Sequence, residues 1–489
     1  MSHFIGGADR EQAWMLPQCV EDYVALDNPV RFIDLFVEGL DAAKIQLTAQ
    51  PAATGRPSYA PTDLLKLYLY GYLNRVRSSR ELERLTQRNL EVMWLLKLLR
   101  PDHKTISEFR RTHRATFKQV FRQFNVMCRD LKLFGAELVA IDGSFFKAVN
   151  SKSRNFTLAK LEGLLQAVDT GIEQYLRELE LNDGSGESAA ALGGGKVARI
   201  KNASERMEAL QSAKARYEQM LGELAASGEG QISLSDPDAR LMRKSDRKDN
   251  IVGYNVQSSV DGAHHLIVEL EATNQGNDGG QFNRMAQGAR RELQTETLVA
   301  VADGGYYSTN DLKEAQAQGI TAHVPPPRDR MDTQGLYPRT DFSYHKEHDE
   351  YQCPGGSRLK RHSDSVQHVR YQVYYNTAAC ARCALRAQCT TGAYRKIKHE
   401  EHPEVMEGMR QRMQAQPQVY ARRKALVEHP FGTLKFWWGH GAFLTRGLEG
   451  VNAEISLSAW AYNMTRAINV LGIQPLLAWA GLSQPKAVC

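Results

Sequence analysis

The chain has 489 residues, of which 42% are hydrophobic and 24% charged, close to the composition of ordinary globular proteins. This composition argues against a disordered, collagen-like or disulfide-scaffold protein, and seven cysteines in so long a chain fit a reducing, cytoplasmic setting. No apolar run reaches the roughly 18 residues of a membrane span, and the start of the chain lacks the pattern of a secretory signal, so we expect neither.

The net charge of +6 is distributed unevenly along the chain. Residues 1–55 carry 3 Lys/Arg against 8 Asp/Glu, a balance of −5, whereas residues 56–132 carry 17 against 7, a balance of +10. Such a basic block is typical of a surface that contacts nucleic acid, although a solvated helical face is an equal alternative. The arginines that we expect to contact phosphates are Arg75, Arg77, Arg80 and Arg84.

The basic block is predicted to form short helices. A start signal stands at Pro61, and Ser78 is expected to cap the following helix. Thr105 and Glu108 form a capping box for a longer helix that continues to Phe134. Short helices with arginine-rich faces are compatible with a helix-turn-helix-like DNA-binding region.

A mixed α/β pattern follows the basic block. Buried-strand patterns at Glu137–Val149 and Thr297–Tyr307 enclose two further strands that are joined by the turn at Asp261. Residues 157–228 read as a helical hairpin with a Gly/Ser-rich tip. A long helix is expected from Pro403 to Lys435 or beyond, with Pro430 as the candidate position of a kink, and an apolar helix over 451–471 closes the core. These patterns predict a mixed sheet with helices.

Three carboxylates carry the chemistry that the sequence predicts. Asp142 and Asp303 each follow a buried apolar strand and precede a glycine, which gives the backbone clearance at a sheet edge. A turn-forming Asp-Gly pair is the alternative for either one. Glu428 and Lys435 are seven residues apart and share a helix face, where a surface ion pair is the alternative. Two Asp and one Glu would suit two Mg²⁺ or Mn²⁺ ions, which prefer hard oxygen ligands.

Long stretches of the sequence resemble the DDE transposases of bacterial insertion sequences. The matching motifs are LVAIDGSFFKAVNSKSRNFT, SLSDPDARLM, GYNVQSSVDGAHHLIVELEATNQGNDGGQ, VAVADGGYYS and VEHPFGTLKFWWG. The N-terminal stretches GRPSYAPTDLLKLYLYGYLNRVRSSRELER and PDHKTISEFRRTH resemble the helical domain that precedes the catalytic core in one branch. The resemblance spans roughly residues 1 to 470, and its motifs stand in family order.

The resemblance implies an α/β protein with an RNase H-like mixed-sheet core, a preceding all-α DNA-binding region and two insertions. It implies that Asp142, Asp303 and Glu428 are the catalytic and metal-binding residues. One branch carries a Tyr–Arg–Glu–Lys signature, whose first and last spacings are kept by Tyr420 with Arg423 and by Glu428 with Lys435. The signature has three residues between its Arg and its Glu. Counted back from Glu428, that position holds Lys424 instead of an arginine. The residues expected to contact DNA near the site are Lys435, Tyr420, Arg423 and Lys424.

The function implied is that of a bacterial transposase that acts in the cytoplasm. It would cut double-stranded DNA at the terminal inverted repeats of its element and join the 3′-hydroxyl ends to target DNA. A homodimer or larger assembly on the DNA is expected. The alternatives are a metal-dependent nuclease of the same fold without strand transfer, and a catalytically silent DNA-binding derivative.

Four of the seven cysteines fall between the second Asp and the Glu. Cys380 and Cys383 have a metal-ligand spacing, with Cys389 and Cys353 nearby in sequence. Four thiolates would suit a structural Zn²⁺ ion, and unligated thiols are the alternative. Trp437 and Trp438 follow Lys435, and core packing is favoured for them over stacking on an extruded base.

The predicted organisation has six parts. They are an acidic arm (1–55), the basic helical region (56–135), the first part of the RNase H-like core (136–156 and 229–327), the helical hairpin (157–228), the cysteine-bearing insertion (328–402) and a C-terminal catalytic and core-closing segment (403–475).

Overall fold

The computed structural model describes most of the chain. The described residues are 19–47, 58–150, 154–183, 194–228, 230–243, 250–326, 335–367, 369–400 and 402–482. Residues 1–18 and 48–55 of the expected acidic arm, residues 184–193 of the expected Gly/Ser-rich tip and Cys489 lie outside them. Among the described residues, no helix combines the length and the apolar character that crossing a membrane requires.

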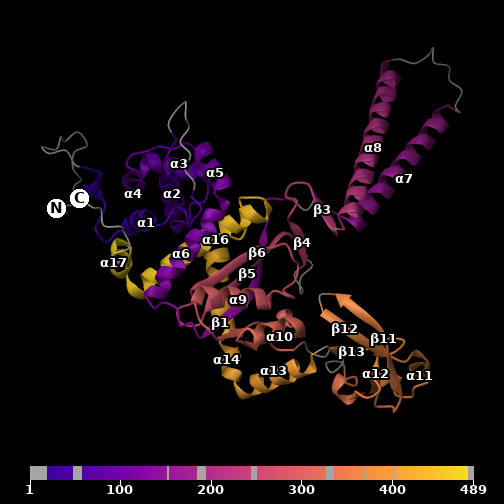
Figure 1. The fold of residues 1–489 in the computed structure, drawn as a ribbon. Coiled ribbons are helices and arrows are strands. Elements are labelled where there is room, and N and C mark those ends of the chain that lie inside the picture. The colour runs from indigo at the N-terminus through magenta and orange to yellow at the C-terminus, as the bar shows by residue number, and fades with distance from the viewer. Residues whose placement is uncertain are drawn as a thin grey trace, which may run out of the picture.

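Helices make up the N-terminal region (Figure 1). They are the short 3-10 helix η1 (Val20–Tyr23), α1 (Pro29–Glu38), α2 (Pro61–Leu73), α3 (Ser79–Arg88), α4 (Leu90–Leu95), α5 (His103–Thr112) and α6 (Arg114–Asp130). Phe32 and Phe36 of α1 stack on each other and contact Phe124 of α6. The described part of the acidic segment is therefore packed into the core instead of extending as a free arm.

The expected helix from Thr105 to Phe134 is wrong in two respects. It begins earlier, because the carboxylate of Asp102 accepts a hydrogen bond from the Thr105 backbone N–H at 2.8 Å and caps α5. It also divides at His113, whose backbone angles (φ −111°, ψ 39°) are not helical. Two helices, α5 and α6, thus replace the one predicted.

The central sheet has six strands. They are β1 (Leu138–Lys147), β4 (Arg240–Arg243), β5 (Asn250–Asp261), β6 (Ile267–Thr273), β7 (Leu298–Val301) and β8 (Ile320–His323). β5 pairs antiparallel with β1 on one edge and with β4 and β6 on the other. β7 lies parallel to β1, and β8 lies parallel to β7. The order across the sheet is therefore β4-β5-β1-β7-β8, and β6 pairs with β5 on the same side as β4.

Helices cover both faces of this sheet. Val139 and Ile141 of β1 pack in one apolar cluster with α9 (Phe282–Leu293) and α10 (Thr309–Ala317). Leu138 and Ala140, on the opposite face of β1, pack against α15 (Arg423–Gly432). The even-numbered residues of β1 consequently face α15.

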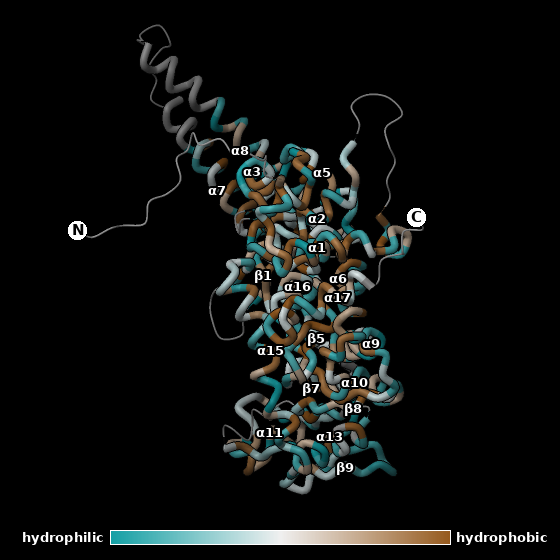
Figure 2. Tube along the Cα trace, turned by 90° about the vertical axis from the view of Figure 1, so that its left-hand side faces the viewer, coloured by the Kyte–Doolittle hydropathy of each residue, from teal (hydrophilic) through white to brown (hydrophobic). Residues whose placement is uncertain are grey.

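The helix α16 (Gly447–Leu471) joins the helical region to the sheet. It packs against α2, α6 and β6, and it runs through the middle of the molecule in both views (Figures 1 and 2). Trp460 at its centre is fully buried and contacts Phe36 and Phe124. The predicted core-closing helix is confirmed, and α17 (Gln474–Leu482) follows it.

Two segments stand apart from the central sheet (Figure 1). The helices α7 (Leu158–Asp183) and α8 (Gly194–Ser227) pack against each other and project from the body. Their base is closed by the antiparallel pair β2 (Asn155–Thr157) and β3 (Gln231–Ser233). A small apolar cluster of their own includes Phe156, Leu161, Met220 and Leu224.

The cysteine-bearing segment forms a separate antiparallel sheet. Its strands are β9 (Ser343–His345), β10 (Glu350–Gln352), β11 (Arg358–Gln367), β12 (Val369–Tyr375) and β13 (Ile397–Glu400), in the order β13-β12-β11-β10-β9. The short helices α11 (Thr377–Ala381) and α12 (Arg386–Cys389), with the 3-10 turn η6 (Arg339–Asp341), complete it.

The expected continuous helix from Pro403 to Lys435 is wrong. The chain forms α13 (Pro403–Ala415), α14 (Pro417–Ala421), α15 and a π-helical segment, η7 (Thr433–Trp437). The first break lies before Pro417, because proline pushes the preceding residue out of the helical region, and Gln416 has φ −132° and ψ 58°. Pro430 lies inside α15.

Candidate active site

Asp142 and Asp303 are brought together by the register of two parallel strands. Ala140 of β1 pairs with Val301 of β7, so the same register, continued by two residues, sets Asp142 opposite Asp303. Both aspartates stand at the carboxyl-terminal side of this pairing, the side on which parallel sheets commonly hold their ligands. Because Asp142 shares the face of Leu138 and Ala140, it faces α15.

Arg423, the first residue of α15, bridges the two aspartates. Its Nη2 donates to Oδ1 of Asp142 at 2.8 Å and to Oδ2 of Asp303 at 3.3 Å. The side chain of Arg423 is 17% exposed and that of Asp142 23%, so this ion pair is largely shielded from water. A cationic group therefore occupies the position between the two carboxylates.

The electrostatics of Asp142 reflect a crowded acidic site. Burial raises the pKa of Asp142 to about 6; the Arg423 charge opposes this shift, and the nearby charges of Asp303 and Asp278 add to it. Asp303 is more open, with 43% of its side chain exposed, and its Oδ1 accepts the Gly305 N–H at 2.8 Å. Both groups would bind a cation more readily than two isolated surface carboxylates because their charges lie close together.

Glu428 does not join the two aspartates in this conformation. Its side chain is 64% exposed and lies 3.9 Å from Lys424, one turn earlier on α15. Within the described parts of the chain, no three His, Cys, Asp or Glu side chains are gathered closely enough to hold a metal ion. The helix that carries Glu428 nevertheless packs on β1 through Leu426 and Val427.

Lys435 lies against the strand of Asp142. Its ammonium donates to Ser144 Oγ and, at 2.6 Å, to the Phe145 carbonyl, and it lies 4.4 Å from the centre of the Phe146 ring. The residues after it differ from expectation, because Phe436 is 84% and Trp437 80% exposed, while Trp438 packs on the core. The predicted core packing of Trp437 is wrong, and an exposed aromatic pair stands beside Lys435.

The arginines of the basic block fall into two groups. Arg77 donates to Glu454 Oε1 at 3.1 Å and to the Ala442 carbonyl at 3.0 Å, and this favours a structural role for it. Arg75, Arg80 and Arg84 are exposed. Tyr420, at the end of α14, is half-buried.

Sequence reasoning missed a basic cleft between the helical region and the end of β1. The cleft has a volume of about 380 Å³, and its lining includes Arg110, Arg111, Arg114 and Arg446 together with Val149. Three of the four arginines belong to the basic block, so the positive charge of that block was the sequence feature that could have indicated this cleft. Arg446 comes from the turn before α16, which sequence alone does not place beside α5.

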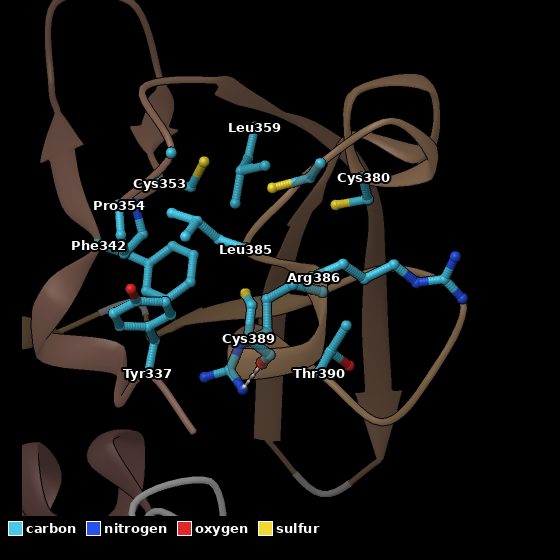
Figure 3. A pocket seen from close by; sticks show the side chains of 13 residues that line it. Tyr337, Phe342, Cys353, Pro354, Leu359, Cys380, Leu385, Arg386, Cys389 and Thr390 are labelled. Carbon is cyan, nitrogen blue, oxygen red and sulfur yellow. Dashed lines mark hydrogen bonds between the residues drawn. The ribbon is translucent and has the colours of Figure 1, made fainter. Parts of the chain in front are cut away.

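The four cysteines of the insertion line one small pocket of about 30 Å³ (Figure 3). Cys353 follows β10, Cys380 and Cys389 belong to α11 and α12, and Cys383 lies between these helices. All four are half-buried and form no disulfide. Leu385 projects into the same space, and the sulfur atoms are not arranged as a closed metal site among the described residues.

Two family models match the chain. Residues 18–112 match a transposase domain (DUF772), and residues 229–464 match a transposase DDE domain. This chain belongs to the DDE transposases. The two matched ranges indicate DNA transposase activity and include Asp303, Arg423 and Glu428, whereas Asp142 lies between them.

One solved structure has a weak likeness to this transposase. It is described as a cryo-EM structure of the piggyBac transposase synaptic complex with hairpin DNA, at 8% sequence identity and a TM-score of 0.26. The alignment covers 95% of this chain and 86% of that one, and a score this low carries no inference. No curated protein matches the chain.

Proposed function

We propose that this transposase cleaves DNA at the terminal inverted repeats of an insertion sequence and joins the freed 3′-hydroxyl ends to target DNA. The observation that carries the proposal is the placement of Asp142 and Asp303 at neighbouring parallel strands, facing the helix of Glu428. The strand order, with β4 and β6 antiparallel to β5, β5 antiparallel to β1, and β7 and β8 parallel to β1, supports an RNase H-like core.

The catalytic residues in this proposal are Asp142, Asp303 and Glu428. Carboxylate oxygens suit Mg²⁺ or Mn²⁺, and the two aspartates already share one cationic partner in Arg423, which supports their fit to a cation. When bound, two such ions would activate a water or a 3′-hydroxyl and stabilise the leaving oxygen of a phosphodiester.

The protein's own part in the reaction is a rearrangement at α15. Arg423 has to leave Asp142 and Asp303, and Glu428 has to turn from Lys424 toward them. Both residues lie in the first two turns of α15, so a change at this end of the helix would affect both of them. The released guanidinium of Arg423 and the ammonium of Lys424 would then contact a DNA phosphate.

Several surfaces support double-stranded DNA as the partner. The arginine-lined cleft and the exposed Arg75, Arg80 and Arg84 offer contacts to the phosphate backbone. Lys435, Tyr420 and the exposed Trp437 lie on the segments flanking Glu428, where the end of the DNA would be held. We infer a homodimer or larger assembly on paired DNA ends, acting in the bacterial cytoplasm.

A strand-cleavage and joining assay tests the function. A labelled duplex that carries the element's terminal repeat is incubated with Mg²⁺ or Mn²⁺ and target DNA, and both cut and joined products are expected. Asp142→Asn, Asp303→Asn and Glu428→Gln should each reduce both products to background, while the exposed Glu347→Gln in the separate sheet should not. Cutting without joining would identify a nuclease, and binding with neither would identify a silent derivative. Full activity in all three variants would refute the site.

We also propose that the four-cysteine pocket holds a structural Zn²⁺ ion. Cys353, Cys380, Cys383 and Cys389 supply the thiolate set that zinc prefers, in a small sheet with few buried side chains. Metal analysis of the purified chain should find one Zn²⁺, which is lost in Cys380→Ser but kept in the exposed Cys19→Ser. Purified wild-type protein that contains no stoichiometric zinc would rule this site out.

A further inference from the structure

The basic cleft beyond the end of β1 is built from parts of the chain that are far apart in sequence. One side comes from α5 and the start of α6, with Arg110, Arg111 and Arg114, and another from the turn before α16, with Arg446. Val149, just after β1, also lines it. The cleft therefore connects the N-terminal helices to the strand of the candidate active site.

The arginines of the cleft are only loosely neutralised. Arg111 pairs with Glu108, and Arg114 pairs with Glu449 at 3.3 Å, but these carboxylates are 54% and 83% exposed. Ion pairs that are exposed to this degree contribute little to stability, so a phosphate group can replace either carboxylate. Arg446 is exposed and takes part in no ion pair among the described residues.

The backbone on both sides of Arg446 is held by carboxylates. Glu454 of α16, whose side chain is 1% exposed, accepts hydrogen bonds from the N–H groups of the two residues before Arg446, at 2.9 and 3.0 Å. Asp236 and Asp238 accept from the N–H groups of the two residues after it, at 3.0 and 2.8 Å. An exposed arginine on a backbone held in this way loses less conformational freedom when it binds an anion.

The same turn is hydrogen-bonded to the end of β1. The Lys147 N–H donates to the Gly441 carbonyl at 3.0 Å, and the Phe443 N–H donates to the Lys147 carbonyl at 2.9 Å. From Asp142 to Lys147, β1 pairs with β5 without a break, so this stretch is extended. A rise of about 3.3 Å per residue places Val149 about 20 Å from Asp142. The fold thus sets the distance between the cleft and the candidate active site.

We propose that this cleft binds the phosphate backbone of the DNA about six base pairs from the bond that is cut, with Arg111, Arg114 and Arg446 as the phosphate-binding residues. The phosphates of one strand advance about 3.4 Å each along a duplex, so a duplex that follows β1 from Asp142 reaches the cleft after about six of them. The inference rests on the proposed function, because it counts from the bond that Asp142 would help to cut.

The double variant Arg111→Ala/Arg446→Ala tests the cleft, because both side chains are exposed. The matched control is Arg291→Ala, an exposed arginine in the last turn of α9, on the other face of the sheet from α15. Fluorescence anisotropy at several salt concentrations measures binding of a labelled duplex that carries the element's terminal repeat. The double variant should raise the Kd about tenfold or more and lower the slope of log Kd against log salt by about 2, whereas the control should change neither.

Neutral methylphosphonate linkages, placed singly along the duplex, measure the distance. A linkage about six base pairs from the mapped cut should weaken binding by the wild type and have no further effect on the double variant, because the arginines that contact it are already absent. Linkages next to the cut should weaken both proteins equally. Thermal unfolding of each variant reports whether the fold is intact.

Three outcomes would contradict parts of this account. An unchanged Kd in the double variant, or the same effect of every neutral linkage in both proteins, refutes the cleft while the proposed function stands. A changed oligomeric state of the DNA-free double variant, with DNA binding intact, assigns the cleft to contact with a second copy of the chain and also refutes it. If the wild type neither binds nor cuts the duplex, the cleft and the proposed function are both refuted.

Discussion

The guanidinium of Arg423 donates to the carboxylate of Asp142 at 2.8 Å, although 281 residues separate the two in the chain. The same nitrogen reaches Asp303 at 3.3 Å. One arginine thus contacts both carboxylates that the proposed reaction needs for cations, and its single positive charge offsets one of their two negative charges. Binding of Mg²⁺ must therefore compete with Arg423 for these two carboxylates.

Replacing Arg423 by alanine should make stability more dependent on metal. Without the arginine, the largely buried Asp142 keeps an uncompensated charge, which we expect to lower the free energy of unfolding by about 1–3 kcal/mol in metal-free buffer. Added Mn²⁺ should then raise the Tm of the variant more than that of the wild type, as measured by calorimetry. Lys424→Ala, an exposed neighbour on α15, is the control, and equal shifts in all three proteins would contradict the prediction.

Replacing Gly143 by alanine should disturb the buried amides of Asn255 and Gln257, which donate to Oδ1 of Asp278. The added Cβ would lie 2.4 Å from Gln257 Nε2 and 2.5 Å from Asp278 Oδ1, so this buried network would have to shift. We expect a loss of about 1–3 kcal/mol in unfolding free energy and a lower DNA cleavage rate. Gly163→Ala on α7 is the control, because its Cβ meets nothing within 4 Å and should be neutral or slightly stabilising. Unchanged stability in Gly143→Ala would contradict the prediction, because the buried amides and Asp278 would then accommodate the added methyl group at no cost.

Arg77 and Arg84 should respond differently to alanine substitution. Loss of Arg77 leaves Glu454, whose side chain is 1% exposed, without its cationic partner, which should cost about 3 kcal/mol of unfolding free energy. Arg84 pairs with Glu81 on the surface, so Arg84→Ala should leave denaturant unfolding nearly unchanged and weaken DNA binding, with a shallower dependence on salt. The opposite pattern would place the DNA contact at Arg77.

His440 should make the fold sensitive to mild acid. Burial, followed by the charges of Arg77 and Arg75, lowers the pKa of His440 to about 3, and the ring stays neutral next to Tyr72 and Trp438. Below pH 6.5 the unfolded chain takes up a proton at this residue that the folded chain does not, so stability falls as the pH falls from 6.5 toward 3. This residue alone should account for about 2 kcal/mol of lost stability between pH 7 and pH 5.

The measurement for His440 is urea unfolding of the wild type and of His440→Gln at both pH values. The variant should lose less stability on acidification, whatever its stability at pH 7. The exposed His348→Gln is the control and should follow the wild type. A pH dependence that is unaltered in His440→Gln would mean that the buried ring is not the cause.

The sequence predicts the strands of the site better than its helices. Apolar runs that end at Asp142 and Asp303, and the turn at Asp261, are confirmed as β1, β7 and the β5–β6 connection, because strand burial and tight turns leave strong local patterns. The break at Gln416 was not predicted, although proline geometry interrupts the helix there, whereas Pro430, the expected position of a kink, lies inside α15.

The contacts within the site could not be predicted from local pattern. Arg423 reaches Asp142 only because α15 packs on the even face of β1, and Asp278 reaches Gly143 only through the amides of β5. Such contacts join residues far apart in sequence and depend on how elements pack. The roles of Asp142, Asp303 and Glu428 remain predictions, with Glu428 turned away in this conformation.

The short ladder between β2 and β3 separates the projecting helices from the catalytic sheet. Asn155 pairs with Ser233 and Thr157 with Gln231. The two chain segments that connect the helices to the body are therefore hydrogen-bonded to each other. Helical turns can therefore be added to or removed from the far ends of α7 and α8 while β1 and β5 keep their register. The length of the helical hairpin and the residues on its surface can therefore change, and with them its contacts to other molecules, while the position of Asp142 stays the same.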